Sequence, residues 1–204
     1  MKKAYAVAEC FAVILVLQAA LLLLRSALAR LFPDTNFAWR MISMCIMALL
    51  WLAVVCYARL RKTPLSVFPA RFGKRYIIGT VIAAALVLSA PSIFLDGYRG
   101  PLLMLYGSIV TPVYEETLFR GCLWNRLNAA FPKERSTFIW SVLLFAVWHL
   151  GYMLPHLVSG NWSAVLWKMA AGLGYGVVLG LLRLKTKNCY ATMLLHAVLN
   201  TFMI

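Results

Sequence analysis

Long apolar runs separated by short basic segments are the feature of this sequence that most constrains its fold. A helix needs roughly 20 apolar residues to cross a bilayer, and in lipid it must satisfy its own backbone hydrogen bonds because no water is present to do so. The sequence therefore predicts an all-α polytopic membrane protein. The expected transmembrane helices cover seven segments, residues 4–24, 38–58, 76–95, 101–119, 137–157, 162–182 and 189–204.

The composition supports lipid as the solvent of this chain. Hydrophobic residues make up 63% of it and charged residues 13%, whereas a soluble domain carries roughly 25% charged residues. The 20 Lys and Arg outnumber the 6 Asp and Glu, but they lie between the apolar runs and form no basic face interleaved with aromatic side chains. This distribution excludes a nucleic-acid-binding domain and is typical of the cytoplasmic loops of membrane proteins.

The positive charges also predict the orientation of the chain in the membrane. With the N-terminus inside, 15 of the 20 Lys and Arg fall on inner segments and 5 on outer segments. Because cytoplasmic loops carry the excess of Lys and Arg, we expect a cytoplasmic N-terminus. The compactness of the chain and the lack of an organelle-type signal favour a bacterial inner membrane. The polar segment 121–131 is unsuited to crossing lipid, so a short amphipathic helix lying in the interface is expected there, after the fourth span.

Two adjacent acids, Glu115 and Glu116, lie near the end of the fourth expected span. A carboxylate inside a span costs a few kcal/mol unless it has a partner or a function. Arg120 follows Glu116 by one helical turn and can pair with it. Adjacent helical side chains point about 100° apart, so Glu115 should face elsewhere. This pattern predicts one structural carboxylate and one that is free for chemistry; the alternative is a simple ion-pair network at the membrane boundary.

Two further polar pairs stand one helical turn apart, Phe145 with His149 and His196 with Asn200. Each alone is also typical of a hydrogen-bonded contact between helices. Together with Glu115 they supply a general base, imidazoles and an amide that could hold water and stabilise an oxyanion. Glu115, His149 and His196 could instead be three ligands of a catalytic zinc ion. The residues alone do not choose between these mechanisms.

The three motifs resemble those of the CPBP family, which contains CAAX proteases and bacteriocin-processing proteins and is also called the Abi family. They stand here as E-E-T-L-F-R at 115–120, F-A-V-W-H at 145–149 and H-A-V-L-N at 196–200. Their order and separation agree with that family. We therefore expect a single membrane domain over 1–204, with spans without motifs in 1–100 and a CPBP-like catalytic core in 101–204.

The resemblance implies a function and a role for each motif residue. The expected activity is an intramembrane endopeptidase acting on a membrane-associated or lipidated substrate, such as a CAAX-type peptide, a leader peptide or a pheromone precursor. Glu115 would activate water with the assistance of His149. His196 and Asn200 would line the oxyanion side. The residues that would support the structure of the motif are Glu116, Arg120 and Phe145.

Several questions stay open at this level. Members of the family are described both as metalloproteases and as metal-free glutamate proteases, so a divalent metal such as zinc remains an alternative. The expected partners are the bilayer and a peptide or lipidated protein, without nucleic acid. The spacing of Gly172, Gly176 and Gly180 predicts close helix packing, within a monomer or across a homodimer. The rival functions are a non-catalytic immunity or scaffold protein and a small transporter.

Overall fold

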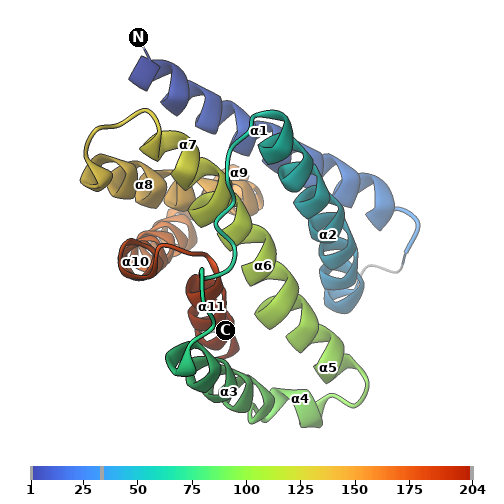
Figure 1. The fold of residues 1–204 in the computed structure, drawn as a ribbon. Coiled ribbons are helices and arrows are strands. Elements are labelled where there is room, and N and C mark those ends of the chain that lie inside the picture. Colours follow the sequence, from blue (N-terminus) through green and yellow to red (C-terminus); the bar gives the residue numbers. More distant parts are fainter. Residues whose placement is uncertain (1, 33–34, 203–204) are drawn as a thin grey trace.

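The computed structural model describes residues 2–32 and 35–202, and this part of the chain contains helices and no strand. Figure 1 shows the helices packed around a long central one, with the N-terminal pair on one side and the last helix on the other. The elements are α1 (Lys2–Ala29), α2 (Asn36–Leu60), α3 (Lys74–Leu88), α4 (Ser92–Leu95), α5 (Arg99–Met104), η1 (Leu105–Val110), α6 (Thr111–Glu116), η2 (Thr117–Leu123), α7 (Trp124–Asn128), α8 (Glu134–Tyr152), α9 (Leu154–Val158), α10 (Trp162–Thr186) and α11 (Tyr190–Phe202).

Three of the described helices are long and apolar enough to cross a membrane by length and composition: α1 with 28 residues, and α2 and α10 with 25 each. The expectation of seven such helices is therefore met only in part. The helix α3 has 15 residues, and the described part of α11 has 13. Both lengths are below the roughly 20 residues that a helix perpendicular to the membrane needs to cross it. The chain is an all-helical integral membrane protein, and the exact number of spans stays a prediction.

The third expected span, 76–95, is not one helix. The helix α3 ends at Leu88, and α4 begins at Ser92 after a break that contains Pro91. Proline lacks a backbone N–H and disfavours the helical conformation of the residue before it. The apolar run therefore continues beyond the end of the helix.

The fourth expected span belongs to a helical run that continues without interruption from α5 to α7. The expected short helix in 121–131 is α7, but it continues the preceding helix instead of standing apart, and its Trp124 and Leu127 are 1% and 0% exposed inside the bundle. Its position at the membrane interface stays a prediction. The polar residues of this segment find protein partners instead of water. Asn125 donates to the carbonyl of Pro64 at 2.5 Å, and Arg126 pairs with Glu9 in α1 at 2.6 Å.

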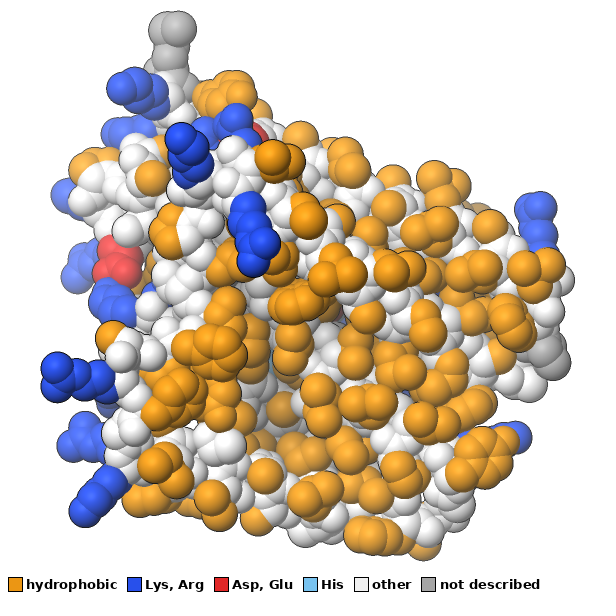
Figure 2. Space-filling model, turned by 45° about the vertical axis from the view of Figure 1, so that its right-hand side comes forward, with side chains coloured by type: hydrophobic (Ala, Val, Ile, Leu, Met, Phe, Trp, Pro, Cys, Tyr) orange, Lys and Arg blue, Asp and Glu red, His pale blue; other side chains and the backbone are white. Residues whose placement is uncertain are grey.

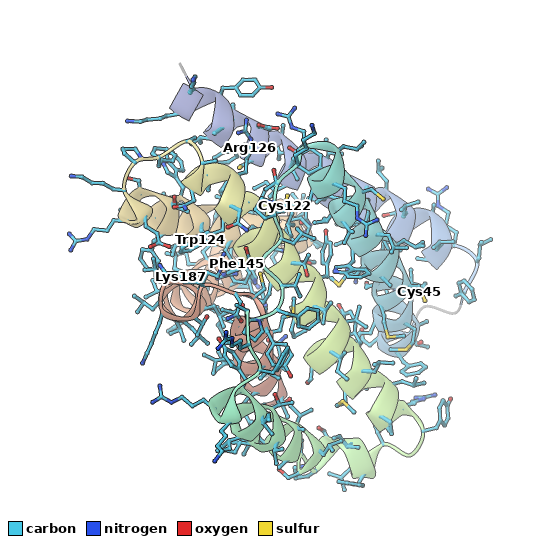
Figure 3. All side chains as sticks on the ribbon, in the orientation of Figure 1. Cys45, Cys122, Trp124, Arg126, Phe145 and Lys187 are labelled. Atoms are coloured by element: carbon cyan, nitrogen blue, oxygen red, sulfur yellow. The ribbon has the colours of Figure 1, made fainter. Side chains whose placement is uncertain are left out.

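Glu9 joins three helices at the end of the bundle where α1 begins. Its carboxylate accepts a hydrogen bond from the Tyr57 hydroxyl at 2.8 Å and pairs with Arg61 at 2.5 Å, in addition to Arg126. Figure 3 places Arg126 at this junction of α7 with α1. Polar groups from α1, α7 and the C-terminal end of α2 therefore stabilise the same contact.

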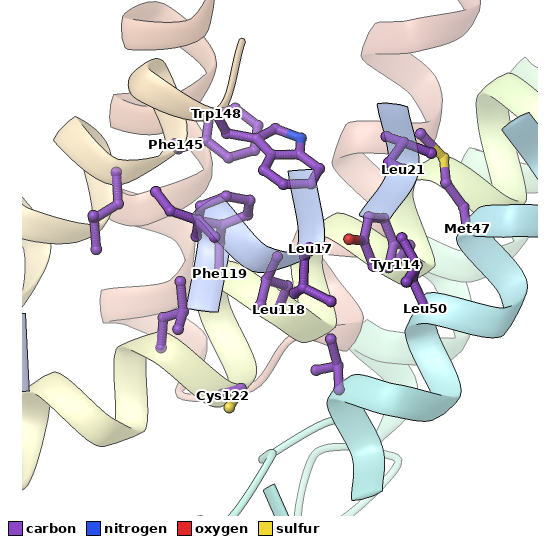
Figure 4. Packing of buried hydrophobic residues seen from close by; sticks show 14 of the residues in the cluster. Leu17, Leu21, Met47, Leu50, Tyr114, Leu118, Phe119, Cys122, Phe145 and Trp148 are labelled. Carbon is purple, nitrogen blue, oxygen red and sulfur yellow. The ribbon is translucent and has the colours of Figure 1, made fainter. Parts of the chain in front are cut away.

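The apolar core lies where α1, α2, α6 with η2, and α8 meet (Figure 4). Leu17 from α1, Met47 from α2, Leu118 from η2 and Trp148 from α8 are all buried in it. This core holds the face of the central helix that carries the two glutamates. The packing of these apolar residues orients the central helix and so helps to set where the two carboxylates point.

The surface carries many large apolar side chains, among them Leu15, Leu49, Ile78 and Leu166, each more than half exposed. Figure 2 shows a broad hydrophobic face, with most Lys and Arg side chains gathered along one edge. This is the surface expected of a chain whose solvent is lipid.

Two of the cations that the sequence placed on inner segments are not loop charges. Arg120 is 0% and Arg183 3% exposed, and both lie among the helices. They therefore do not count among the Lys and Arg of the inner loops. The direction of the N-terminus therefore stays a prediction, on 13 inner charges against 5.

Candidate active site

The central helix is deformed by two π-helical segments, η1 before the glutamate pair and η2 after it. In η1 the Thr111 N–H reaches the Tyr106 carbonyl, which is the i to i+5 bond of a π-helix. The next bond in this register would need an N–H at Pro112, which has none. The Gly107 carbonyl is therefore left without its helical donor, and the side-chain amide of Asn200 donates to it at 2.9 Å.

Glu116 forms the ion pair with Arg120 that the spacing of the motif predicts. It is 0% exposed, and Arg120 donates to its Oε1 at 3.2 Å. The Arg120 guanidinium lies 4.2 Å from the centre of the Phe145 ring and also donates to the Gly176 carbonyl at 3.4 Å. Figure 3 places Phe145 inside the bundle. These contacts join the central helix to α8 and α10.

His196 lies between the two glutamates. Its Nδ1 is 2.9 Å from Glu116 Oε1, and its Nε2 is 3.9 Å from Glu115 Oε2. The first distance is a hydrogen bond, whereas the second is too long for one. On the other side the His196 ring contacts Tyr175 of α10, with ring centres 5.5 Å apart.

Glu115 faces away from Arg120, as the 100° offset requires. Its Oε1 accepts from the indole Nε1 of Trp148 at 3.1 Å and from the Tyr152 hydroxyl at 3.4 Å. Its Oε2 is the oxygen that faces His196. One carboxylate oxygen is thus held by α8, and the other is directed towards an imidazole.

His149 lies next to this group but is held by its own helix. Its Nδ1 is 2.8 Å from the Phe145 carbonyl, and its ring packs edge-on against the Phe145 ring at 4.8 Å. It forms no hydrogen bond to Glu115 or His196 in the described part of the chain. The Nδ1 contact leaves Nε2 as the imidazole nitrogen available for other partners. Gly172 on α10 makes room for this ring, because a Cβ there would lie 3.1 Å from Nδ1.

The described residues include no group of three His, Cys, Asp or Glu side chains arranged to hold a metal ion. The zinc set considered from the sequence, Glu115, His149 and His196, is therefore not assembled here. The Nδ1 atoms of His196 and His149 contact Glu116 and the Phe145 carbonyl, which leaves both Nε2 atoms as the nitrogens that a metal could use, so the question of a metal stays a prediction. The cysteines add no ligand set, since Cys122 lies within the bundle and Cys45 at its edge (Figure 3).

Three residues of this site were not recognised from the sequence: Trp148 and Tyr152, which bond to Glu115, and Tyr175, which contacts His196. Trp148 and Tyr152 stand four residues apart on α8, flanking His149, so their spacing would have placed them on one helical face. Aromatic residues in an apolar span resemble ordinary core, and nothing in the sequence reveals that their polar atoms meet a carboxylate. Tyr175 lies outside the three motifs.

Comparison with known proteins gives the family. The model of the family described as Type II CAAX prenyl endopeptidase Rce1-like matches residues 98–202, which include all three motifs and just over half of the chain. No curated protein and no solved structure matches the chain. The match agrees with the CPBP resemblance of the motifs. The chain belongs to the Rce1-like family of CAAX protease-type membrane endopeptidases.

Proposed function

We propose that the protein hydrolyses a peptide bond of a membrane-associated or lipidated substrate, with Glu115 as the general base. One observation carries the proposal: Glu115 Oε1 is held by Trp148 and Tyr152, while Oε2 faces His196 Nε2 at 3.9 Å. A carboxylate fixed through one oxygen presents the other in a defined direction, which is what a general base needs.

In the proposed reaction, a water molecule hydrogen-bonded to Oε2 gives its proton to Glu115 and attacks the carbonyl carbon of the scissile bond. The C–O bond forms as the carbonyl π electrons move to oxygen. His149, through Nε2, assists the water or the oxyanion, and His196 lines the oxyanion side. The C–N bond then breaks, and Glu115 returns the proton to the leaving amine, so that the carboxylate is regenerated.

The roles of the remaining motif residues follow from their contacts. Glu116, Arg120 and Phe145 hold α6, η2 and α8 together. Asn200 commits one of its two amide hydrogens to Gly107, so only the other could serve an oxyanion. We assign Asn200 first to the support of the π-helical segment.

The test compares new peptide termini in membranes and medium of cells that express the wild type, Glu115→Gln or Glu134→Gln at matched levels. Glu115→Gln keeps the size of the side chain and removes the base. Glu134→Gln is the control, because Glu134 forms an exposed pair with Lys187 far along α8 from the motif. We expect termini that occur with the wild type and Glu134→Gln and are absent with Glu115→Gln; these termini also identify the substrate.

The opposite result is equally informative. If Glu115→Gln is folded, produces the same termini as the wild type and rescues the phenotype of a deletion strain, the general-base proposal is wrong. The non-catalytic immunity or scaffold function would then be favoured. If Glu115→Gln left the peptide termini unchanged but abolished the transport of a solute across the membrane, the small-transporter function would be favoured.

A further inference from the structure

A groove of about 610 Å³ lies between α3 and α11, away from the candidate active site. Its walls are apolar along most of their length, with Ile82 and Leu86 from α3 and Leu194, Leu195 and Val198 from α11. On α11, Leu194 and Val198 project from about the opposite side to His196, and Leu195 about 100° away from it, given 3.6 residues per turn. The groove and the site therefore share a helix but not a face.

One end of the groove is cationic. Arg75, at the start of α3, and Lys185, in the last turn of α10, both line it and are exposed. Neither forms an ion pair with an acid among residues 2–32 and 35–202. The nearby Lys187 differs, since Glu134 binds it at 2.6 Å. The two cations of the groove are thus available for an anion from outside the chain.

The length of the groove matches one leaflet of a bilayer. From Arg75 to Leu86 the helix rises about 16 Å at 1.5 Å per residue, and half of the hydrocarbon core is roughly 15 Å thick. The cationic end lies at the helix termini, where lipid headgroups are found, and the apolar part extends towards the centre of the membrane.

Hydrogen bonds join the two sides of the groove at its cationic end and fix their separation there. The amide of Asn188 donates to the Tyr76 hydroxyl at 2.6 Å, and the Thr80 and Tyr190 hydroxyls are 2.8 Å apart. Gly79 widens the groove, because a Cβ at this position would meet no atom within 4 Å.

We propose that this groove binds one anionic phospholipid, with its phosphate on Arg75 and Lys185 and an acyl chain along Ile82, Leu86 and Val198. Basic pockets between transmembrane helices bind anionic headgroups through the same charge complementarity. The bound lipid would cover the outer face of α11 and so support the helix that carries His196. It is a structural ligand and not the substrate.

The test is native mass spectrometry of the purified protein, with phosphatidylglycerol and phosphatidylcholine of identical acyl chains added in equal amounts. The wild type should retain phosphatidylglycerol in preference. The double variant R75Q/K185Q should lose that preference roughly tenfold or more, since each cation near the headgroups contributes about fivefold. The control R71Q/K74Q makes the same change of charge with exposed residues that do not line the groove, and it should behave as the wild type.

A second variant tests the apolar part. Gly79→Leu fills the groove from α3 without meeting another atom at its Cβ, so it should lower retention of both lipids while the protein stays folded. Equal retention of the two lipids by the wild type, or an equal loss in R71Q/K74Q, would overturn the proposal. No readout depends on peptide cleavage, so its outcome is separate from that of the proposed function.

Discussion

His196 Nδ1 lies 2.9 Å from Glu116 Oε1, so the histidine of α11 is bonded to the carboxylate that pairs with Arg120 and not to the proposed general base. The same oxygen accepts from Arg120 at 3.2 Å. This bond fixes the ring of His196, and thereby the direction of Nε2 towards Glu115. The structural pair and the proposed base are thus linked through one imidazole.

Removing either member of the buried pair should strongly destabilise the protein. Glu116→Ala or Arg120→Ala leaves the partner charge without compensation, and both side chains are 0% exposed. Breaking such a pair costs about 3–5 kcal/mol. We expect a large loss in the free energy of unfolding, measured by denaturation in micelles, together with lower abundance in the cell.

The control for this experiment is Glu134→Ala, which breaks the exposed pair with Lys187. An exposed pair contributes at most about 1 kcal/mol, so this variant should unfold nearly as the wild type does. If Glu116→Ala were as stable as Glu134→Ala, the structural role of Glu116 would be wrong.

Trp148→Phe and Tyr152→Phe should impair turnover by releasing Glu115 Oε1. A hydrogen bond to a charged group contributes about 1.5–3 kcal/mol, so the loss of the 3.1 Å bond from Trp148 should lower kcat roughly tenfold or more. Tyr152 is more distant at 3.4 Å and should matter less. Because these residues position the base and are not expected to bind substrate, KM should change little.

Peptide-cleavage kinetics on the purified variants check this prediction. Tyr114→Phe is the matched control, because its hydroxyl is buried near Glu115 but forms no hydrogen bond in the described structure. Equal kcat values for Trp148→Phe and Tyr114→Phe would show that the indole does not position the carboxylate.

Asn200→Ala should destabilise the protein by about 1–3 kcal/mol, since it leaves the Gly107 carbonyl without a donor. A second substitution, Pro112→Ala, restores an N–H at the position that the π-helical register requires. The double variant should therefore be less destabilised than the sum of the two single variants. Unfolding of all four proteins in micelles gives the coupling energy.

The same four proteins test the oxyanion role of Asn200. If that role dominates, Asn200→Ala will lose activity while keeping its stability, and Pro112→Ala will not offset the loss. Coupling in stability with recovery of activity supports the bond to Gly107 as the main function of Asn200.

Gly172→Ala should reduce turnover by displacing His149, because the added Cβ would lie 3.1 Å from Nδ1. Gly174→Ala, two residues along α10, meets no atom within 4 Å and serves as the control. Alanine favours a helix over glycine by about 1 kcal/mol, so the control should be slightly more stable and fully active. Equal activity of the two variants would mean that α10 does not position His149.

The sequence left open whether the glycines of α10 allow close packing within one chain or between two copies. A Cβ at Gly176 or Gly180 would lie 3.2 Å from Val142 or 2.8 Å from Phe138 of α8. The close approach predicted from their spacing is therefore made within one chain. The sequence could not distinguish this from a homodimer, because the same small residues permit either contact.

The sequence by itself determined the helical class, the membrane as solvent and the pairing of Glu116 with Arg120. These follow from local rules: the length of apolar runs, and the 100° offset of neighbouring side chains on a helix. The same rules did not reveal the partner of Arg126, which is Glu9, 117 residues away along the chain.

Only the tertiary structure decided which groups meet Glu115. The indole of Trp148, the hydroxyl of Tyr152 and the imidazole of His196 reach it from two other helices. Whether an aromatic residue is plain core or a hydrogen-bond donor depends on which helix faces it. That is set by the packing of the whole bundle, which helical periodicity alone does not encode.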